Sequence, residues 1–275
     1  MHSAPTWDPE QYLRHSGHRT RPFLDLLARI PELPAAAEGR PARIADLGCG
    51  PGNVTALLAE RWPDARITGF DLSREMLEQA DKHHAGTTSG GGWLDFRHAD
   101  AARWTPDEPY DLIVSNAALQ WVPNHPESFA GWLEGVVAGG TLAFQVPANF
   151  TAPSHALLGE LCDSPRWRSR LAGRGRLFAH VLDTAEYLGR LVDLGCAADV
   201  WETVYAQLLQ GEDPVLDWVK GTALRPVLTE LEGDGAAVAE FLSQYRDLLR
   251  KAYPPGPHGT VFPYRRVFAV ARKEY

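Results

Sequence analysis

A glycine-rich turn is the part of this sequence best suited to bind a ligand. Gly48, Gly50 and Gly52 follow a short apolar run, in the order Asp-Leu-Gly-Cys-Gly-Pro-Gly that begins at Asp46. Glycine has no Cβ, so the backbone can turn tightly and a ligand can approach the peptide plane. A helix that follows such a turn offers unpaired N–H groups in its first turn. Two classes of ligand use this geometry, the dinucleotides and S-adenosylmethionine (SAM).

Three acidic residues at successive predicted strand ends favour SAM over a dinucleotide. Asp46 stands two positions before Gly48, where a carboxylate suits a cationic amino-acid group better than a pyrophosphate. Asp71 and Asp100 follow the next two predicted strands, and we expect them to accept hydrogen bonds from ribose hydroxyls and from the adenine amino group. A dinucleotide fingerprint requires glycine at the position where this chain has Asn53.

Strands and helices must alternate between residues 43 and 146 to position these groups. The predicted strands are apolar runs that end at polar residues or glycines: Ile44–Leu47, Ala65–Phe70, Trp93–His98, Tyr110–Ser115 and Thr141–Val146. Helical spacing of apolar residues predicts helices over 53–61 and 129–137, and between them a helix with Ser73 as N-cap and with Met76, Leu77 and Ala80 on one face. This alternation predicts a parallel sheet with helices on both faces, and ligands of such sheets bind beyond the carboxyl ends of the strands.

The pattern becomes mostly helical after Pro147. Helices are predicted over 154–171, over 184–194, behind an N-capping Asp213, and over 227–253 with a break at Gly233. Two late strands, at 200–205 and 261–272, are separated by part of this helical insertion. The glycine-rich segment 86–92 is predicted to be a surface loop.

Composition and charge exclude several classes of function. The 27 basic and 35 acidic side chains give a net charge of −8, so we expect no nucleic-acid partner, because phosphate binding needs a basic face. The three cysteines, Cys49, Cys162 and Cys196, exclude a disulfide scaffold and a Cys-only zinc site, and no metal is expected. Reduced cysteines, a start without a leader pattern and short apolar stretches predict a cytoplasmic protein without a membrane partner.

Segments along nearly the whole chain resemble a known family. The glycine turn, residues 70–73 (Phe-Asp-Leu-Ser) and residues 114–122 are similar to the class I SAM-dependent methyltransferases. Further segments resemble one family within that class, the trans-aconitate 2-methyltransferases: Trp7–Leu13, Arg19–Pro22, Asn116–His125, Gln145–Phe150, Asp199–Tyr205, Asp217–Pro226 and Phe262–Arg272.

The resemblance implies a fold and a division of the chain. The fold is α/β, a class I methyltransferase Rossmann-like sheet of seven strands with the last strand antiparallel, and with a helical cap inserted before it. Lid helices are expected at 1–40 and a SAM-binding core at 41–150. The helical cap and substrate region is expected at 151–260, including a late core strand at about 197–207, and the final strand at 261–275. The implied cofactor is SAM, and the implied product is S-adenosylhomocysteine (SAH).

The resemblance also implies which residues contact the ligands. Cofactor contacts are expected from the turn and the strand ends: Asp46, Gly48, Cys49, Gly50, Asp71, Leu72, Met76, Asp100, Ala101 and Asn116. Contacts to a small anionic substrate are expected from Arg19, Trp121, His125, Asn149, Tyr264 and Arg266. Arginine suits such a substrate because its guanidinium pairs with a carboxylate through two hydrogen bonds. Side chains alternate along a strand, so Arg266 and Tyr264 are expected on one face and Arg265 on the other.

The implied reaction is methyl transfer to a carboxylate of trans-aconitate or of a close tricarboxylic acid. A carboxylate is already ionised near pH 7, so no catalytic acid or base is expected. The protein has to bring the oxygen and the methyl group into line and to exclude water.

Three alternative functions stay open at this point. A methyltransferase of a phenol or an amine would need a group that takes a proton, and His15, His18 and His125 are available. A SAM-binding protein without turnover would carry the same cofactor residues. A nicotinamide dehydrogenase would share the glycine turn, although Asp46 and Asn53 argue against it.

Overall fold

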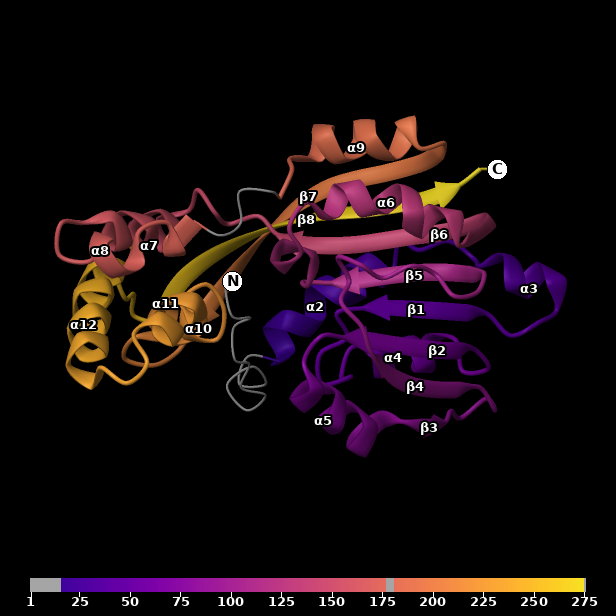
Figure 1. Ribbon diagram of the computed structural model, residues 1–275, viewed down its shortest axis with the longest axis horizontal. Helices are drawn as coiled ribbons and strands as arrows, with labels where there is room; N and C mark the ends of the chain where they lie inside the picture. The colour runs from indigo at the N-terminus through magenta and orange to yellow at the C-terminus, as the bar shows by residue number, and fades with distance from the viewer. Residues whose placement is uncertain (1–15, 177–180, 275) are drawn as a thin grey trace. The chain divides into compact units, whose positions relative to one another are not determined.

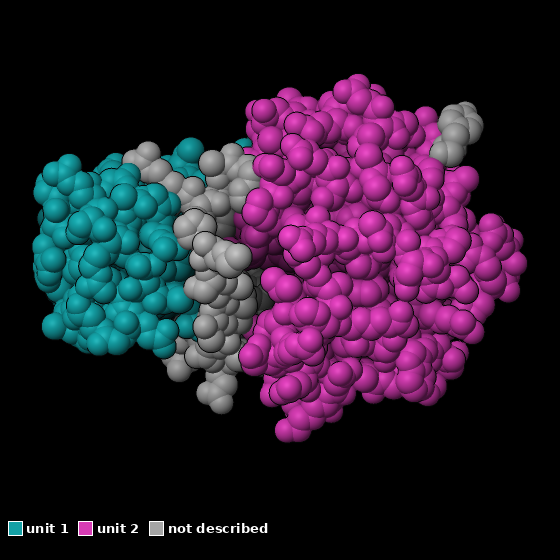
Figure 2. Space-filling model, viewed as in Figure 1, with its two compact units in different colours: residues 1–16, 148–179, 203–266 teal, residues 17–147, 180–202, 267–275 magenta. Residues whose placement is uncertain are grey.

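Two compact units contain the residues that the computed structural model describes, which are 16–176 and 181–274. We name them the sheet unit, with residues 17–147, 181–202 and 267–274, and the helical unit, with residues 16, 148–176 and 203–266 (Figure 2). Residues 1–15 of the expected lid lie outside the described residues. Of the helices in the described ranges, none is long and apolar enough to cross a membrane.

One sheet of eight strands has the order β3-β4-β2-β1-β5-β6-β8-β7 (Figure 1). The strands are β1 (Arg43–Leu47), β2 (Arg66–Asp71), β3 (Gly86–Thr87), β4 (Trp93–His98), β5 (Tyr110–Asn116), β6 (Val136–Pro147), β7 (Cys196–Leu209) and β8 (Thr260–Lys273). Neighbouring strands are parallel from β4 through β2, β1 and β5 to β6. The carboxyl ends of these five strands therefore share one edge of the sheet, as their predicted alternation with helices required.

The eighth strand is β3, and it corrects the expected count of seven. Gly86 and Thr87 pair antiparallel with β4, and the chain turns back through a closed hairpin, with the Thr88 N–H donating to Gly92 O at 3.1 Å. The amides of Gly90 and Gly92 both donate to Pro63 O at 3.2 Å. These backbone hydrogen bonds order a segment that its composition predicted to be a surface loop.

The last strand, β8, runs antiparallel to β6, as the resemblance implied (Figure 1). In the first half of β8, Arg265 O accepts a hydrogen bond from Ala148 N at 3.0 Å, just beyond the end of β6. Near the end of β8, the Lys273 ammonium donates to Val136 O at 2.8 Å, at the start of β6. The late strand β7 extends beyond the 200–205 that the alternation pattern predicts, and it agrees to within two residues with the range of about 197–207 that the resemblance implies.

The helices of the sheet unit can be compared with the starts and ends that the sequence predicts. They are α2 (Ser16–Leu27), α3 (Pro34–Glu38), α4 (Thr55–Arg61), α5 (Arg74–His84), α6 (His125–Glu134) and α9 (Thr184–Asp193). The predicted N-cap Ser73 accepts a hydrogen bond from Met76 N at 3.3 Å. Helix α6 ends before the predicted residue 137, because Gly135 closes it and Val136 enters the sheet beside Tyr110.

Helices of the helical unit are interrupted near a proline and at a glycine of the sequence. They are α7 (Pro153–Asp163), α8 (Arg168–Leu171), α10 (Pro214–Lys220), α11 (Arg225–Glu230) and α12 (Gly235–Ala252). The predicted helix over 154–171 is two helices, because Pro165 forces Ser164 into an extended conformation with ψ 156°. Gly233, with φ +87°, separates α11 from α12 at the expected break. Asp213 sits at the N-cap of α10, but its carboxylate accepts from Arg250 Nε at 2.6 Å instead of capping the helix.

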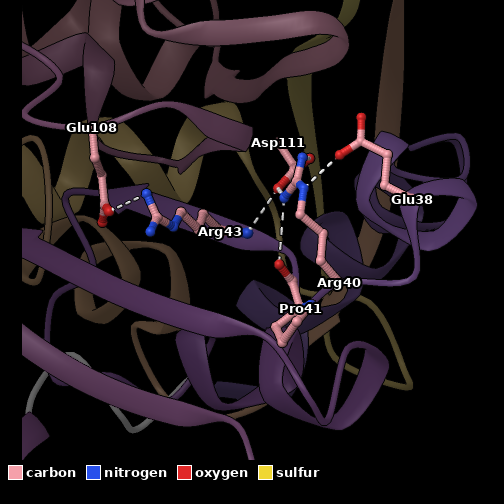
Figure 3. A network of polar contacts seen from close by, with 6 residues as sticks. All are labelled: Glu38, Arg40, Pro41, Arg43, Glu108 and Asp111. Carbon is pink, nitrogen blue, oxygen red and sulfur yellow. Dashed lines mark hydrogen bonds and ion pairs between the residues drawn. The ribbon is translucent and has the colours of Figure 1, made fainter.

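An ion-pair network closes the amino-terminal edge of the sheet, opposite the strand ends that could bind a ligand (Figure 3). The Arg40 guanidinium donates two hydrogen bonds, of 2.7 and 2.8 Å, to the fully buried carboxylate of Asp111 at the start of β5. The backbone N–H of Arg43 donates to the same carboxylate at 2.9 Å. The network therefore fixes β1 against β5 and anchors the segment that precedes β1.

Candidate functional site

The glycine turn after β1 lies against the segment that follows β5. Gly48 has φ +79° and donates its N–H to Phe70 O at 2.7 Å. A Cβ on Gly48 would come within 2.2 Å of the Ala118 Cβ, so only glycine fits this turn. Gly50 has φ +57°, and a Cβ there would meet nothing within 4 Å. The turn is thus closed on one side at Gly48 and open at Gly50, where a ligand can approach the backbone.

Asp71, at the end of β2, holds the turn in place with one oxygen and α5 with the other. Its Oδ2 accepts from Gly50 N at 2.8 Å, and its Oδ1 accepts from Ser73 N at 2.8 Å. Burial raises the pKa of this carboxyl, and the hydrogen bonds from Ser73 and Gly50 oppose that rise. A carboxylate has about four lone-pair sites, so both oxygens keep capacity for ligand hydroxyls.

Asp46, in β1, is fully buried behind the turn. Its Oδ2 accepts from the Thr55 hydroxyl at 2.7 Å, whereas its Oδ1 has no hydrogen-bond partner among the described residues. Burial raises the pKa of Asp46 to about 7, the Thr55 hydrogen bond lowers it, and the negative charge of Asp71 raises it further. A buried carboxylate with an unpaired oxygen is stabilised by a nearby cation, so this position fits the amino group of a bound amino acid.

The remaining expected cofactor residues also lie in the sheet unit. Leu72 follows Asp71 with 52% of its surface exposed, and it presents an apolar face that suits a flat ring. Met76 and Cys49 are buried, and burial raises the pKa of the Cys49 thiol. Asp100, in the segment with Ala101 after β4, accepts a hydrogen bond from Ala102 N at 3.0 Å.

Gln145 is a neighbour of the site that its residue type alone did not single out. This fully buried side chain on β6 donates from Nε2 to Asn116 Oδ1 at 2.6 Å. Its backbone oxygen accepts from Ala117 N at 2.9 Å. Ala117 has φ +54°, a strained conformation for alanine of the kind that gathers at ligand-binding turns. The parallel register that pairs Asn116 with Gln145 is the signal that could have revealed the contact.

His125, an expected substrate contact, lies between Tyr187 and the backbone of Val122. It is fully buried at the start of α6, and its Nε2 lies 2.7 Å from the Tyr187 hydroxyl on α9. Its Nδ1 lies 3.3 Å from Val122 O, and its ring stacks on Tyr187 with centroids 5.8 Å apart. Trp121, in the preceding 3-10 turn, is half-buried. The side chain of Arg19 lies outside the described residues.

The helical unit brings together the other expected substrate residues on and beside β8. Arg266 and Tyr264 are 3% and 4% exposed, and the Arg266 guanidinium lies 5.0 Å from the Tyr264 ring centroid. Arg265 is less buried, as alternation along the strand predicts. Asn149 is 3% exposed and accepts from Arg265 N at 2.9 Å, while its Nδ2 has no partner among the described residues.

Comparison with known proteins decides the family. Residues 44–140 match a family model described as a methyltransferase domain. A trans-aconitate 2-methyltransferase from Streptomyces coelicolor is 65% identical over 271 residues, which cover 98% of this chain and 88% of that protein. The chain belongs to the trans-aconitate 2-methyltransferase family. A family member from Rhodococcus jostii is 45% identical over 269 residues, covering 97% of this chain and 99% of that protein.

Solved structures confirm the class I methyltransferase fold of this family member. The YcgJ protein from Bacillus subtilis has a TM-score of 0.55 at 12% identity and covers 94% of this chain and 99% of that one. Phosphoethanolamine N-methyltransferase 2 from Haemonchus contortus, in complex with S-adenosyl-L-methionine, has a TM-score of 0.52 at 16% identity, covering 93% of this chain and 53% of that one. Membership of the trans-aconitate 2-methyltransferase family, shown by the 65% identity to the Streptomyces coelicolor protein, rules out the alternative of a nicotinamide dehydrogenase.

Proposed function

We propose that this methyltransferase transfers the methyl group of SAM to one carboxylate of trans-aconitate, giving a monomethyl ester and SAH. The observation that carries the proposal is the 65% identity over 98% of the chain to a protein named for that reaction. The buried, half-paired Asp46 supports it independently, because this carboxylate suits the cationic amino group that SAM carries.

The cofactor residues bind and orient, and they do no proton chemistry. SAM, when bound, supplies a methyl group on a positively charged sulfur, and the methyl passes to the carboxylate oxygen while the electrons of the broken bond stay on sulfur. We assign Asp46 to the amino group, Asp71 to the ribose hydroxyls and Asp100 to the adenine amino group. Leu72 provides an apolar surface for the adenine ring, since it is exposed beside Asp71. Gly48, Cys49, Gly50, Met76, Ala101 and Asn116 complete the expected cofactor contacts.

Substrate binding needs positive charge and hydrogen-bond donors. We assign Arg266 to a substrate carboxylate, because its guanidinium is buried beside Tyr264 and can donate two hydrogen bonds to a carboxylate. The unpaired Nδ2 of Asn149 and the neighbouring Tyr264 supply a further donor and an aromatic surface. In the sheet unit, Arg19 and Trp121 stay predicted contacts. His125 is assigned to packing, because it is fully buried against Tyr187.

A carboxylate nucleophile needs no general base, because it is ionised near pH 7. The protein contributes alignment of the oxygen with the methyl group and exclusion of water. We propose that residues 1–40 act as a lid and that residues 151–260 form the substrate region. A cytoplasmic location is supported by three cysteines that are free and buried, Cys49, Cys162 and Cys196.

The test is an end-point assay with SAM and a panel of acids: trans-aconitate, cis-aconitate, citrate, isocitrate and a phenol. Both SAH and the product mass are measured. The proposal predicts a methyl ester from trans-aconitate. SAH formed only with the phenol would indicate a methyltransferase of a different substrate class. Tight SAM binding without SAH formation from any acid would favour a binding protein without turnover.

A further inference from the structure

Gln145 holds the loop behind β5 with both its side chain and its backbone. Its Nε2 donates to Asn116 Oδ1 at 2.6 Å, and its backbone oxygen accepts from Ala117 N at 2.9 Å. Both contacts follow from the parallel register of β5 with β6, in which Asn116 and Gln145 are direct partners. Loss of the Gln145 side chain would remove only the first of these contacts, because the backbone bond to Ala117 does not depend on residue type.

The hydrogen bond from Gln145 fixes which end of the Asn116 carboxamide faces outward. A carboxamide has one acceptor oxygen and one donor nitrogen. Since Oδ1 accepts from Gln145, the outward group is the Nδ2 amide, which makes no hydrogen bond to any described residue. Asn116 is 6% exposed at the end of β5, so a ligand that contacts this side chain meets an N–H donor.

The position of this donor ties it to the cofactor turn. Ala117 bends the chain away from β5 with φ +54°, and Ala118 then fills the space that a side chain at Gly48 would need. The Asn116 carboxamide is therefore anchored at the same carboxyl edge of the sheet as the glycine turn. Both ligands of the proposed reaction carry carboxylates, one set on the acid substrate and one on the methionine part of SAM.

We propose that Gln145 is a positioning residue that fixes Asn116 as a hydrogen-bond donor toward a carboxylate oxygen. The inference rests on the proposed function for the identity of the ligands. A donor suits an anionic oxygen, whereas an outward Oδ1 would repel it and would suit the N–H of an amine nucleophile. The pair Gln145–Asn116 thus sets the polarity of the site in favour of a carboxylate ligand.

Three variants separate this polarity from a structural role. The quantity compared is kcat/KM for trans-aconitate or the affinity for SAH. Asn116→Asp keeps an oxygen that accepts from Gln145 but turns a second, anionic oxygen outward, and we expect this quantity to fall by about 100-fold or more. Asn116→Ala removes the donor alone, with an expected loss of about tenfold. A structural role predicts the reverse order, because aspartate retains the bond to Gln145 and alanine does not. Gln145→Leu frees the carboxamide to rotate, and we expect a loss of about tenfold without a change in thermal stability of the size seen for a core cavity.

Two measurements identify the carboxylate that accepts the bond. The first is kcat/KM for trans-aconitate at saturating SAM, and the second is the Kd of SAH by calorimetry. A fall confined to kcat/KM assigns the donor to the substrate, and a rise in the Kd of SAH assigns it to the cofactor. The double variant Asn116→Ala with Gln145→Leu is expected to lose no more than Asn116→Ala alone, since both changes remove one oriented donor.

The inference is overturned if Asn116→Asp is no worse than Asn116→Ala in both measurements, or if the losses at Asn116 and Gln145 simply multiply. Failure of the proposed function has a different signature. Wild-type protein that binds SAH but forms no ester from trans-aconitate would refute the substrate, while the calorimetric comparison of the same variants would still test the donor.

Discussion

Replacing Asp46 by asparagine should remove a pH-dependent cost of folding. The wild-type carboxyl is fully buried with an unpaired Oδ1, and burial raises its pKa from 3.8 to about 7. Because the pKa is higher in the folded state, that state binds the proton more tightly than the unfolded chain between about pH 4 and pH 7. Below about pH 4, Asp46 therefore leaves the free energy of unfolding unchanged. Between about pH 4 and pH 7 it lowers the free energy of unfolding progressively, and above pH 7 its effect is constant.

The size of this effect follows from the shift. At 1.36 kcal/mol per unit, a rise from 3.8 to about 7 corresponds to about 4 kcal/mol. The free energy of unfolding of the wild type should fall by about that amount, relative to Asp46→Asn, between pH 4 and pH 7. Urea unfolding at several pH values measures the difference. Glu134→Gln, at an exposed carboxylate on α6, is the charge-matched control, because it removes one negative charge without touching a buried group.

The ionisation of Asp46, which lowers the free energy of unfolding, should strengthen the binding of SAH. If SAH places its cationic amino group beside ionised Asp46, the pKa of about 7 makes the affinity about 30-fold higher at pH 8 than at pH 5.5. Calorimetry with Asp46→Asn should give weaker binding with no such trend. An SAH affinity that is flat with pH in the wild type, or equal in the two proteins at pH 8, would refute the assignment of Asp46 to the amino group.

Three further predictions concern the turn, the opposite edge of the sheet and the substrate arginine. Gly48→Ala should lower the free energy of unfolding by about 3 kcal/mol and abolish SAH binding, because its Cβ would lie 2.2 Å from Ala118; normal binding would contradict the close fit. Asp111→Asn should cost about 2–3 kcal/mol in urea unfolding, since Arg40 loses its buried partner, yet kcat should stay near wild type. Arg266→Gln should raise KM for trans-aconitate about tenfold or more without changing the Kd of SAH, and an unchanged KM would remove it from the substrate contacts.

The core of the sheet could be predicted from sequence because buried parallel strands leave a strong pattern. All seven residues of β5 are buried, and its apolar run is unmistakable. Strand β3 has no such pattern, since it consists of Gly86 and Thr87 and depends on backbone hydrogen bonds. A two-residue strand held by the main chain cannot be found from side-chain periodicity.

The candidate site could be predicted as far as its residues follow strand ends. Asp46 and Asp71 lie where the sequence pattern placed them, around the glycine turn. His125 also follows a strand, but its hydroxyl partner Tyr187 is 62 positions away, and this distant contact buries it. Gln145 and Asn116 are 29 positions apart and meet only through the register of the sheet. Contacts of this kind depend on tertiary packing, which residue types and local spacing do not encode.

The most direct test of the proposed reaction uses SAM with an isotopically labelled methyl group. Purified protein is incubated with labelled SAM and trans-aconitate, and the product is examined by mass spectrometry. The account predicts a trans-aconitate monomethyl ester that carries the label, formed in equal amount with SAH. Protein that binds SAH with normal affinity but leaves trans-aconitate unlabelled would contradict the account.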